Sequence, residues 1–537
     1  MKKKTKRFVA LLMASAMTFS LTVSGSAEEV VSGTVDVVNV AASDPSDCQP
    51  FKTDKGTKSM FLQVYQSLYD LDPDTGELCA VLADASRGEY GGYDIIDETT
   101  YHIYIYDYIY DHAGNHVTAS DVAFTYMHNI EEGYKSYYSK LDQAVAVDDT
   151  TVELQLSAPI ENVGELTPYL VNIWVYTEAA YEASPSQFAT DTCGTGPYIM
   201  TEFVSGSSIT LEKNEDYWQT DESLTNERNQ AYADKIVYNF MSEETQIVIG
   251  LESGSIDFAT KISLDSCVDF LEGGSYEDEV GVSVLEDNKQ CCLLPNCDES
   301  SPMSDVNLRL AVYYAIDNAS VVQALGSGTA IATSTLGLST GCSDYNPEWE
   351  EKETYMSTYD PELAKEYLAQ SSYNGETLVL MANTDDNGKY ETAAIVIQAF
   401  LQAVGINCEL MIESKSTVDT LRLDPSNFDM EIASPSFTSY VMEEYKYIFN
   451  TDSTETGLTQ WYIGDDELMD LYYTAYALET TGTDSMNALY DYIIENGYAY
   501  GMFQNYSATA YRTDKIVSVT YQGQHLPVPG SNIYVAE

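Results

Sequence analysis

Basic residues are scarce in this chain. Its 537 residues include 25 lysines and arginines but 85 aspartates and glutamates, which gives a formal net charge of −60. Such a charge repels nucleic acids and anionic membrane surfaces, so we expect neither as a partner. The acidic excess indicates a solvated acidic surface, and a preference for cationic ligands is the second interpretation.

Long apolar runs are absent after the N-terminal segment. Met1 to Ala27 has a basic start, an apolar centre and small residues at its end, which is typical of a secretory signal peptide. No later run is long enough to predict a membrane-spanning helix. The first cysteine is Cys48, so no lipid-attachment cysteine follows the signal directly. We expect an exported protein, extracellular or in the cell envelope, and periplasmic if its source has an outer membrane.

Recognisable metal-binding patterns are also lacking. Cys291, Cys292 and Cys297 lie close together, but their spacing is not that of a zinc site and no histidine is near. Buried thiols on a strand are the better interpretation. His112 and His116 have no evident third ligand, so we expect histidines of a surface loop. The sequence therefore predicts no metal and no cofactor.

The most informative stretch runs from Cys193 to Trp218. It opens with Gly-Thr-Gly-Pro at 194–197, where the glycines permit unusual backbone dihedrals. Strand-forming residues at 198–204 and 208–213 flank a Ser-Gly-Ser turn, which predicts a β-hairpin. Tyr217 and Trp218 then provide an aromatic anchor.

Other segments predict helices. Apolar residues at 61, 64, 65 and 68 fit one helical face, and Thr118 is a candidate N-cap with Asp121 three residues later. The segment 302–317 has apolar residues at helical spacing, and Asp305 can pair with Arg309 one turn on. A helix at 390–404 between strands at 378–381 and 406–412 indicates a parallel αβ unit.

Together these blocks resemble the family 5 (oligopeptide, dipeptide and nickel type) extracellular solute-binding proteins of ABC importers. The resemblance covers nearly the whole chain after the signal, in at least six blocks in the right order, among them G-T-G-P-Y … N-x-x-Y-W at 194–218. It implies an α/β fold, a two-lobed periplasmic-binding-protein-like clamshell of type II in its large three-domain form with mixed sheets. The implied divisions are a signal peptide at 1–27, domain I at 28–55, 193–290 and 506–537, an inserted domain II at 56–192, and domain III at 291–505 as the second lobe.

The resemblance also implies ligand-binding residues. In the family, backbone groups before an Asp-Pro pair bind an extended ligand, which points here to Val40, Ala41, Ala42 and Ser43. Arg422 lies near a family arginine that can meet a ligand carboxylate. The family aspartate that takes a peptide ammonium has no counterpart at 434–438, although Glu443 and Glu444 are close. The neighbouring residues complete the predicted site: Phe437, Thr438, Ser439 and Tyr440.

The implied function is that of a monomeric receptor that binds peptides between its lobes and delivers them to ABC transporter permease subunits. Two alternatives stay open. The first is a secreted hydrolase that uses Ser339 of the G-x-S-x-G at 337–341 with His525, or a metal at His112 and His116. A G-x-S-x-G nucleophile elbow needs a strand before it and a helix after it, and the sequence predicts neither here. The second is a receptor-like protein used for sensing or adhesion rather than import.

Overall fold

A single mixed sheet runs through the whole molecule. The computed structural model describes residues 35–535, apart from 52–58, 72–77, 134–139, 161–162, 227–228, 327–328, 339–341, 343, 385–387, 437–440, 450–460, 477–482 and 520–532. The large sheet has 11 strands in the order β15-β14-β16-β12-β17-β11-β1-β10-β9-β8, with β13 paired to β17. Its strands, in chain order, are β1 (Val35–Ala42), β8 (Tyr198–Val204), β9 (Ser208–Lys213), β10 (Ala233–Phe240), β11 (Phe258–Ile262), β12 (Val280–Pro295), β13 (Ala330–Ala332), β14 (Thr377–Asn383), β15 (Asn407–Glu413), β16 (Met430–Ala433) and β17 (Tyr500–Arg512).

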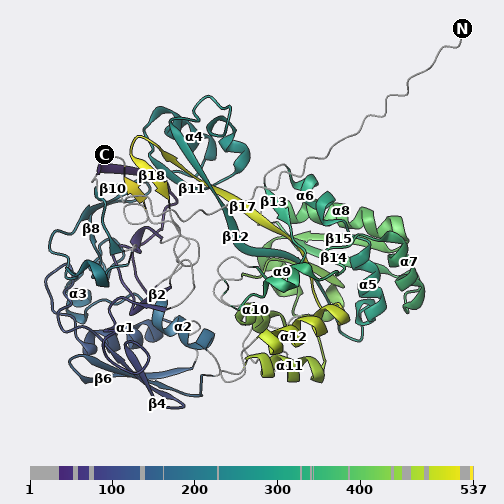
Figure 1. Cartoon of the computed structure of the whole chain (residues 1–537), viewed down its shortest axis with the longest axis horizontal. Helices are drawn as coiled ribbons and strands as arrows, with labels where there is room; N and C mark the ends of the chain where they lie inside the picture. The colour runs from purple at the N-terminus through teal and green to yellow at the C-terminus, as the bar shows by residue number, and fades with distance from the viewer. Residues whose placement is uncertain are drawn as a thin grey trace, which may run out of the picture.

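The elements form two lobes (Figure 1). In the first lobe, β1 pairs in parallel with β10 and β11, and the β8–β9 hairpin extends the sheet. In the second lobe, β14 pairs in parallel with both β15 and β16. The predicted hairpin is confirmed, since its two strands have the expected bounds. The predicted parallel αβ unit is confirmed too, since α8 connects the parallel strands β14 and β15.

A separate antiparallel sheet lies at the far end of the first lobe (Figure 1). Its order is β4-β5-β7-β6. Its second strand ends at Tyr104, and a turn follows at 107–108. The strands of this sheet and of two small pairs are β4 (Tyr93–Asp97), β5 (Thr100–Tyr104), β6 (Leu141–Asp148), β7 (Thr151–Leu156), β2 (Tyr69–Leu71), β3 (Leu78–Ala80), β18 (Ile516–Val519) and β19 (Ile533–Val535).

Helices cover both lobes, and Figure 1 shows that most of them belong to the second. Among the described residues, no helix is both long and apolar enough to cross a membrane. The helices are α1 (Ala119–Glu131), α2 (Val163–Val171), α3 (Glu178–Ala183), α4 (Glu244–Ser253), α5 (Val306–Tyr314), α6 (Asn318–Leu325), α7 (Pro361–Gln370), α8 (Lys389–Val404), α9 (Lys415–Leu421), α10 (Val441–Phe449), α11 (Asp466–Tyr476) and α12 (Thr483–Asn496).

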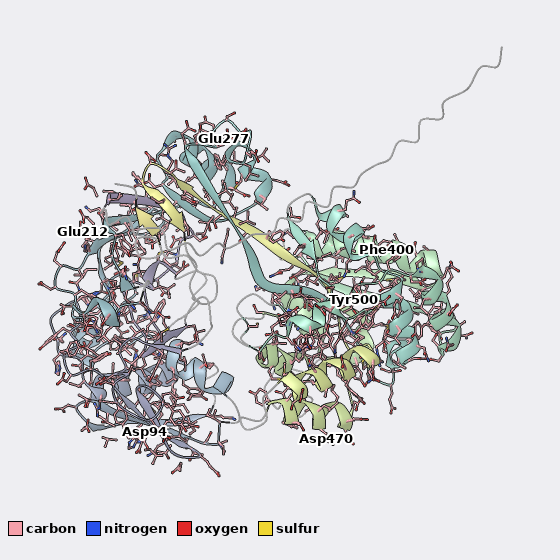
Figure 2. The ribbon with its side chains drawn as sticks, in the orientation of Figure 1. Asp94, Glu212, Glu277, Phe400, Asp470 and Tyr500 are labelled. Atoms are coloured by element: carbon pink, nitrogen blue, oxygen red, sulfur yellow. The ribbon has the colours of Figure 1, made fainter. Side chains whose placement is uncertain are left out.

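The hydrophobic cores are separate. One large cluster consists of buried residues between Cys291 and Phe503, all in the second lobe. Tyr500 lies within it, whereas Glu277 and Asp470 project from the periphery (Figure 2). The first lobe has three smaller clusters, one of them around the β4–β7 sheet. Met60 to Tyr65, which the sequence places in domain II, instead pack in the core beside β1 and β10. The domain boundaries remain a prediction.

The two lobes are joined by β12 and β17, which cross between them as an antiparallel ribbon (Figure 1). Pairing runs from Val280 with Arg512 to Leu293 with Tyr500. The register is irregular between Glu286 and Gln290, because four steps on β12 face two on β17. Such an irregularity bends a ribbon and increases its local twist.

The predicted helix at 61–68 is not formed. A short 3₁₀ turn at Ser59–Phe61 is followed by irregular chain, although all four apolar positions are buried. The reason lies in the backbone carbonyls of this segment. Those of Gln63 and Val64 accept from the N–H groups of Tyr198 and Gly196, and that of Gln66 accepts from Val175. These carbonyls are therefore not available for the i→i+4 bonds of a helix.

The predicted helix at 302–317 is broken. A 3₁₀ turn (Pro302–Ser304) precedes α5, and Asp305 caps α5 by accepting from the Asn307 N–H at 2.8 Å. The predicted ion pair of Asp305 with Arg309 is wrong, because the buried guanidinium donates to backbone carbonyls instead. Elsewhere the Thr118 cap is confirmed, with the Asp121 carboxylate accepting from the Thr118 N–H at 2.9 Å.

Candidate ligand-binding site

A cavity of about 450 Å³ opens beside the ribbon on the second lobe. Its lining comes from several strands, helices and loops rather than from one element. Polar and charged groups dominate the lining. The residues are Lys289, Leu294, Asn383, Tyr390, Lys415, Arg422, Glu431, Ala433, Ser434, Pro435, Glu444, Ile448, Trp461 and Asn505.

A buried ion pair forms one wall of this cavity. The Arg422 guanidinium, at the end of α9, donates to both carboxylate oxygens of Glu431 on β16, with Nε to Oε2 at 2.6 Å. Glu431 is fully buried and the Arg422 side chain is 15% exposed. Burial raises the pKa of Glu431, while the guanidinium beside it acts in the opposite direction. A bidentate pair of this kind holds a side chain in one orientation.

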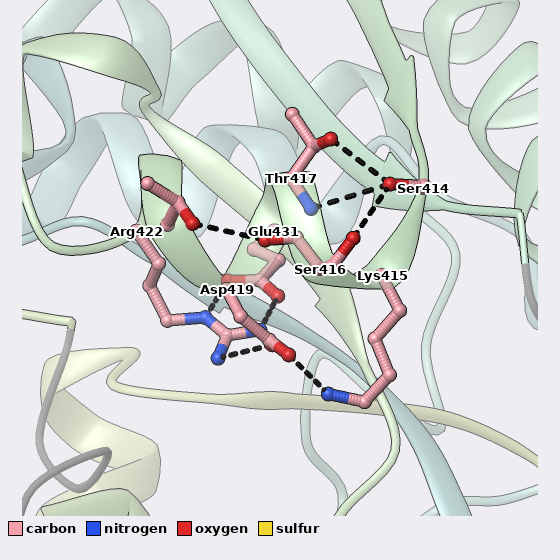
Figure 3. Close-up of polar contacts among 8 residues, drawn as sticks. Ser414, Lys415, Ser416, Thr417, Asp419, Arg422 and Glu431 are labelled. Carbon is pink, nitrogen blue, oxygen red and sulfur yellow. Dashed lines mark hydrogen bonds and ion pairs between the residues drawn. The ribbon is translucent and has the colours of Figure 1, made fainter.

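The pair belongs to a larger network that is electrically balanced (Figure 3). Arg422 also contacts Asp419 at 3.3 Å, and Asp419 accepts from the Lys415 ammonium at 2.6 Å. Two bases therefore face two acids. Ser414 caps α9 from its N-terminal end by accepting from the Thr417 N–H, which fixes the helix that carries three of the four charged groups.

Trp461 lies against this network. The Arg422 guanidinium carbon is 5.7 Å from the centre of the Trp461 ring, a cation–π distance. The indole is 9% exposed and lines the cavity. Its Nε1–H has no hydrogen-bond partner among the described residues. An unpaired buried donor is costly, so this group needs an acceptor that the described protein does not supply.

The ribbon also contributes to the lining of the cavity. Lys289 on β12 forms an isolated bridge with Ser436, and Asn505 on β17 accepts from the Lys389 ammonium at 3.0 Å. The next residue, Gln290, donates its N–H to the Pro435 carbonyl at 3.1 Å. The cavity therefore touches both strands that join the lobes, next to their irregular register.

The comparison with protein families decides what kind of protein this is. The model described as "Bacterial extracellular solute-binding proteins, family 5 Middle" matches residues 94–457, which is more than half of the chain. The chain belongs to this family. Proteins of this family bind solutes and are not enzymes, so a solute-binding role follows.

Individual relatives are distant but extensive. The oligopeptide-binding protein OppA of Bacillus subtilis is 24% identical over 426 residues, covering 68% of this chain and 73% of that protein. The structure of HbpA2 from Haemophilus parasuis matches with a TM-score of 0.79 at 17% identity, over 94% of this chain and 100% of that one. AppA of Bacillus subtilis in complex with a nonapeptide matches with a TM-score of 0.67 at 18% identity, over the same shares. These likenesses confirm the predicted α/β two-lobed clamshell.

The structure separates the predicted site residues. Arg422 lines the cavity, whereas Val40, Ala41 and Ala42 lie in β1 of the other lobe, between β10 and β11. Ser43 is exposed just beyond the strand end. The role of these four residues in ligand binding stays a prediction. The remaining predicted residues lie outside the described part of the chain: Phe437, Thr438, Ser439 and Tyr440.

Two residues of the hydrolase alternative, Ser339 and His525, lie outside the described residues. His116 is an exposed loop residue, as expected, but His112 is partly buried. Its Nδ1 accepts from the Gly194 N–H at 3.3 Å and its Nε2–H donates to the Gly196 carbonyl at 2.9 Å. Burial lowers the pKa of His112, so the ring stays neutral and joins two backbone segments.

Several lining residues were missed from the sequence. Trp461, Lys289 and Asn505 stand in no motif that the sequence analysis recognised. Glu431 carried a usable signal. It stands directly after Phe428-Asp429-Met430, in a strand of apolar residues, and a carboxylate at such a position requires a partner. Glu444, noted in the sequence as a nearby carboxylate, does line the cavity.

Proposed function

We propose that this protein is the exported receptor of an ABC importer, which binds peptides between its lobes and delivers them to permease subunits. The observation that carries the proposal is the polar cavity at the ribbon, on one lobe of a fold whose family binds solutes. The names of relatives such as the oligopeptide-binding protein OppA favour peptides as the solute. Residues 1–27 act as the signal peptide in this proposal, and the domains divide as the sequence predicts except that residues 60–65 pack with domain I.

Binding and closing are coupled in the proposed mechanism. A peptide held in the cavity gains contacts with the first lobe, including Ser43, only when the lobes approach each other. Ligand therefore shifts the population toward the closed form. The β12–β17 ribbon is the hinge, because its irregular register lies where the lobes join.

The two ends of a peptide have different partners in this proposal. Its ammonium group faces a carboxylate, for which Glu444 is the candidate among the lining residues. Glu444 thus takes the place of the family aspartate that is missing at 434–438. Backbone amides of the peptide face the amide side chains of Asn383 and Asn505.

Native mass spectrometry of the purified protein tests the proposal. We expect bound masses that correspond to short peptides. After the bound peptides have been removed, added synthetic peptides should raise the unfolding temperature. At a peptide concentration one hundred times Kd, the free energy of unfolding should rise by about 2.7 kcal/mol. The peptides should be recovered intact.

Two outcomes would contradict the proposal. A peptide library that leaves the unfolding temperature unchanged would exclude a peptide receptor. Shortened peptides after incubation would instead support the hydrolase alternative.

A further inference from the structure

The edge of β17 changes its partner strand where the two lobes meet. On the first-lobe side β11 pairs with β17 as far as Ile262, which lies opposite Ala508. On the second-lobe side β13 pairs with the same edge, beginning with Ala330 opposite Asn505. The irregular register of β12 lies in the same region, on the other edge of β17. Both edges of β17 are thus interrupted close to the residues between Asn505 and Ala508, where rotation of the lobes breaks the fewest backbone hydrogen bonds.

The two lobes approach each other across this interruption. The 3₁₀ helix η5 (Leu264–Phe270) follows β11 in the first lobe, and α6 precedes β13 in the second. Gly326 is the C-cap residue of α6. The carboxylate oxygen Oδ2 of Asp265 in η5 lies 3.9 Å from the position that a Cβ on Gly326 would take. A charged side chain of one lobe therefore faces the end of a helix of the other lobe.

The charges at this contact oppose each other. A helix C-terminus has a partial negative charge from its carbonyl groups, and α6 has no basic residue in its last turn to offset that charge. Asp265 is exposed and forms no ion pair within the described chain. The carboxylate and the helix end therefore repel each other, which raises the free energy of a form that holds them together.

The structure has the features of an open form. Among the described residues, all those that line the cavity belong to the second lobe or to the β12–β17 ribbon, whereas a closed form would add residues of the first lobe. Figure 1 shows α4 and α6 on one side of the crossing ribbon and α2 and α10 on the other, and η5 packs beside α4. A rotation that brings α2 toward α10 therefore moves η5 away from α6.

We infer that Asp265 increases the affinity for the ligand from outside the cavity, because its repulsion of the α6 C-terminus destabilises the open form and is relieved when the lobes close. The inference rests on the proposed function, since it concerns the closing of the same lobes on the same ligand. Where the closed form is the minor one without ligand, apparent affinity is proportional to its population. A higher free energy of the open form thus gives tighter binding, although Asp265 does not line the cavity.

Charge variants of Asp265 test the inference by isothermal titration calorimetry at low salt, with a tetrapeptide of zero net charge. D265N keeps the shape of the side chain but removes the repulsion, and D265K replaces the repulsion with an attraction to the helix end. We expect Kd to rise about twofold for D265N and about fivefold for D265K, the scale of one exposed charge at a helix end. In about 1 M salt, where charges are screened beyond about 3 Å, the three Kd values should agree within about 1.5-fold.

The variant E277K is the matched control for the change in net charge. Glu277 is also an exposed acid of the first lobe, but it projects from the periphery of that lobe (Figure 2). The Kd of E277K at low salt should stay within about 1.5-fold of the wild-type value, since its charge lies beyond the screening distance of the contact. The unfolding temperature without ligand should be the same for all variants, which separates a change in lobe closure from a loss of folding.

Each other result overturns a defined claim. Equal affinities of the wild-type protein, D265N and D265K, or tighter binding by D265K, would overturn the role of Asp265 but leave peptide binding intact. An equal loss of affinity in E277K, or a loss in D265K that persists at high salt, would overturn it too. Should D265K fail to fold, D265N decides, because it keeps the shape of the side chain. Absence of binding by the wild-type protein to every peptide would overturn the proposed function and this inference with it.

Discussion

At the scale of single residues, the two glycines of Gly-Thr-Gly-Pro show why a residue can be indispensable for a reason other than its dihedral angles. Neither is among the residues with positive φ. A Cβ on Gly194 would lie 2.0 Å from the Val64 carbonyl oxygen, and one on Gly196 would lie 2.1 Å from that of Gln63. The sequence correctly marked this stretch as central, but it gave the wrong reason, because close backbone approach depends on a distant segment.

Replacing Gly196 with alanine should therefore destabilise the first lobe. The new Cβ meets backbone atoms that cannot rotate away, so we expect a loss of about 1–3 kcal/mol in the free energy of unfolding, as for overpacking in a core. Urea denaturation measures the loss. The control is G464A, since Gly464 has open space around its Cβ position and should change stability by less than about 0.5 kcal/mol. A loss no larger than the control's would show that this contact relaxes easily.

Prediction of individual site residues from the sequence had a physical limit. Arg422 was found because it stands in a recognisable block before Phe428. Trp461, Lys289 and Asn505 become neighbours only when β12, β17 and the chain before α11 fold together. No pattern of neighbouring residues in the sequence encodes this spatial proximity. Contacts made by residues far apart in the chain are the part of a site that a single sequence conceals.

At the scale of elements, sequence patterns predicted some elements with their bounds and failed at others. The helix α8 and the strands β8 and β9 match their predictions because local propensity and packing agree there. The segment 61–68 has the right apolar spacing, yet its carbonyls bind another part of the chain. Tertiary hydrogen bonds thus override a helical pattern where a neighbouring backbone competes for the same groups.

Arg309 shows how one side chain can join three elements. It is 3% exposed, and from α5 it donates to the carbonyls of Met303 and Ser304 in the preceding 3₁₀ turn and to that of Asn496 at the end of α12. A lysine cannot reproduce this fork. We expect R309K to lose about 2 kcal/mol or more in urea denaturation of the second lobe, because buried carbonyls lose their donors.

The control for this substitution is K365A. Lys365 forms an exposed pair with Glu362 on α7, and its loss should cost less than about 0.5 kcal/mol. Equal stabilities of R309K and the wild-type protein would show that water replaces the guanidinium at these carbonyls.

At the scale of the whole molecule, separate cores predict separate unfolding. The second-lobe cluster contains residues from Cys291 to Phe503, and the chain passes between the lobes along β12 and β17. We expect differential scanning calorimetry to show two transitions without ligand, since multidomain proteins depart from two-state behaviour. R309K should lower only one of them. A single transition whose calorimetric and van't Hoff enthalpies agree would contradict this expectation.

The crossing ribbon has a mechanical consequence. Its strands are hydrogen-bonded to each other on both sides of the junction, so the lobes can rotate about it but cannot slide along it without breaking that ladder. In such a rotation, the displacement of each atom grows with its distance from the rotation axis. Lys289 and Asn505 sit on the pivot itself, so the cavity they line keeps its shape while the outer rims travel furthest. A ligand can thus bind at the ribbon end of the cavity before the lobes close.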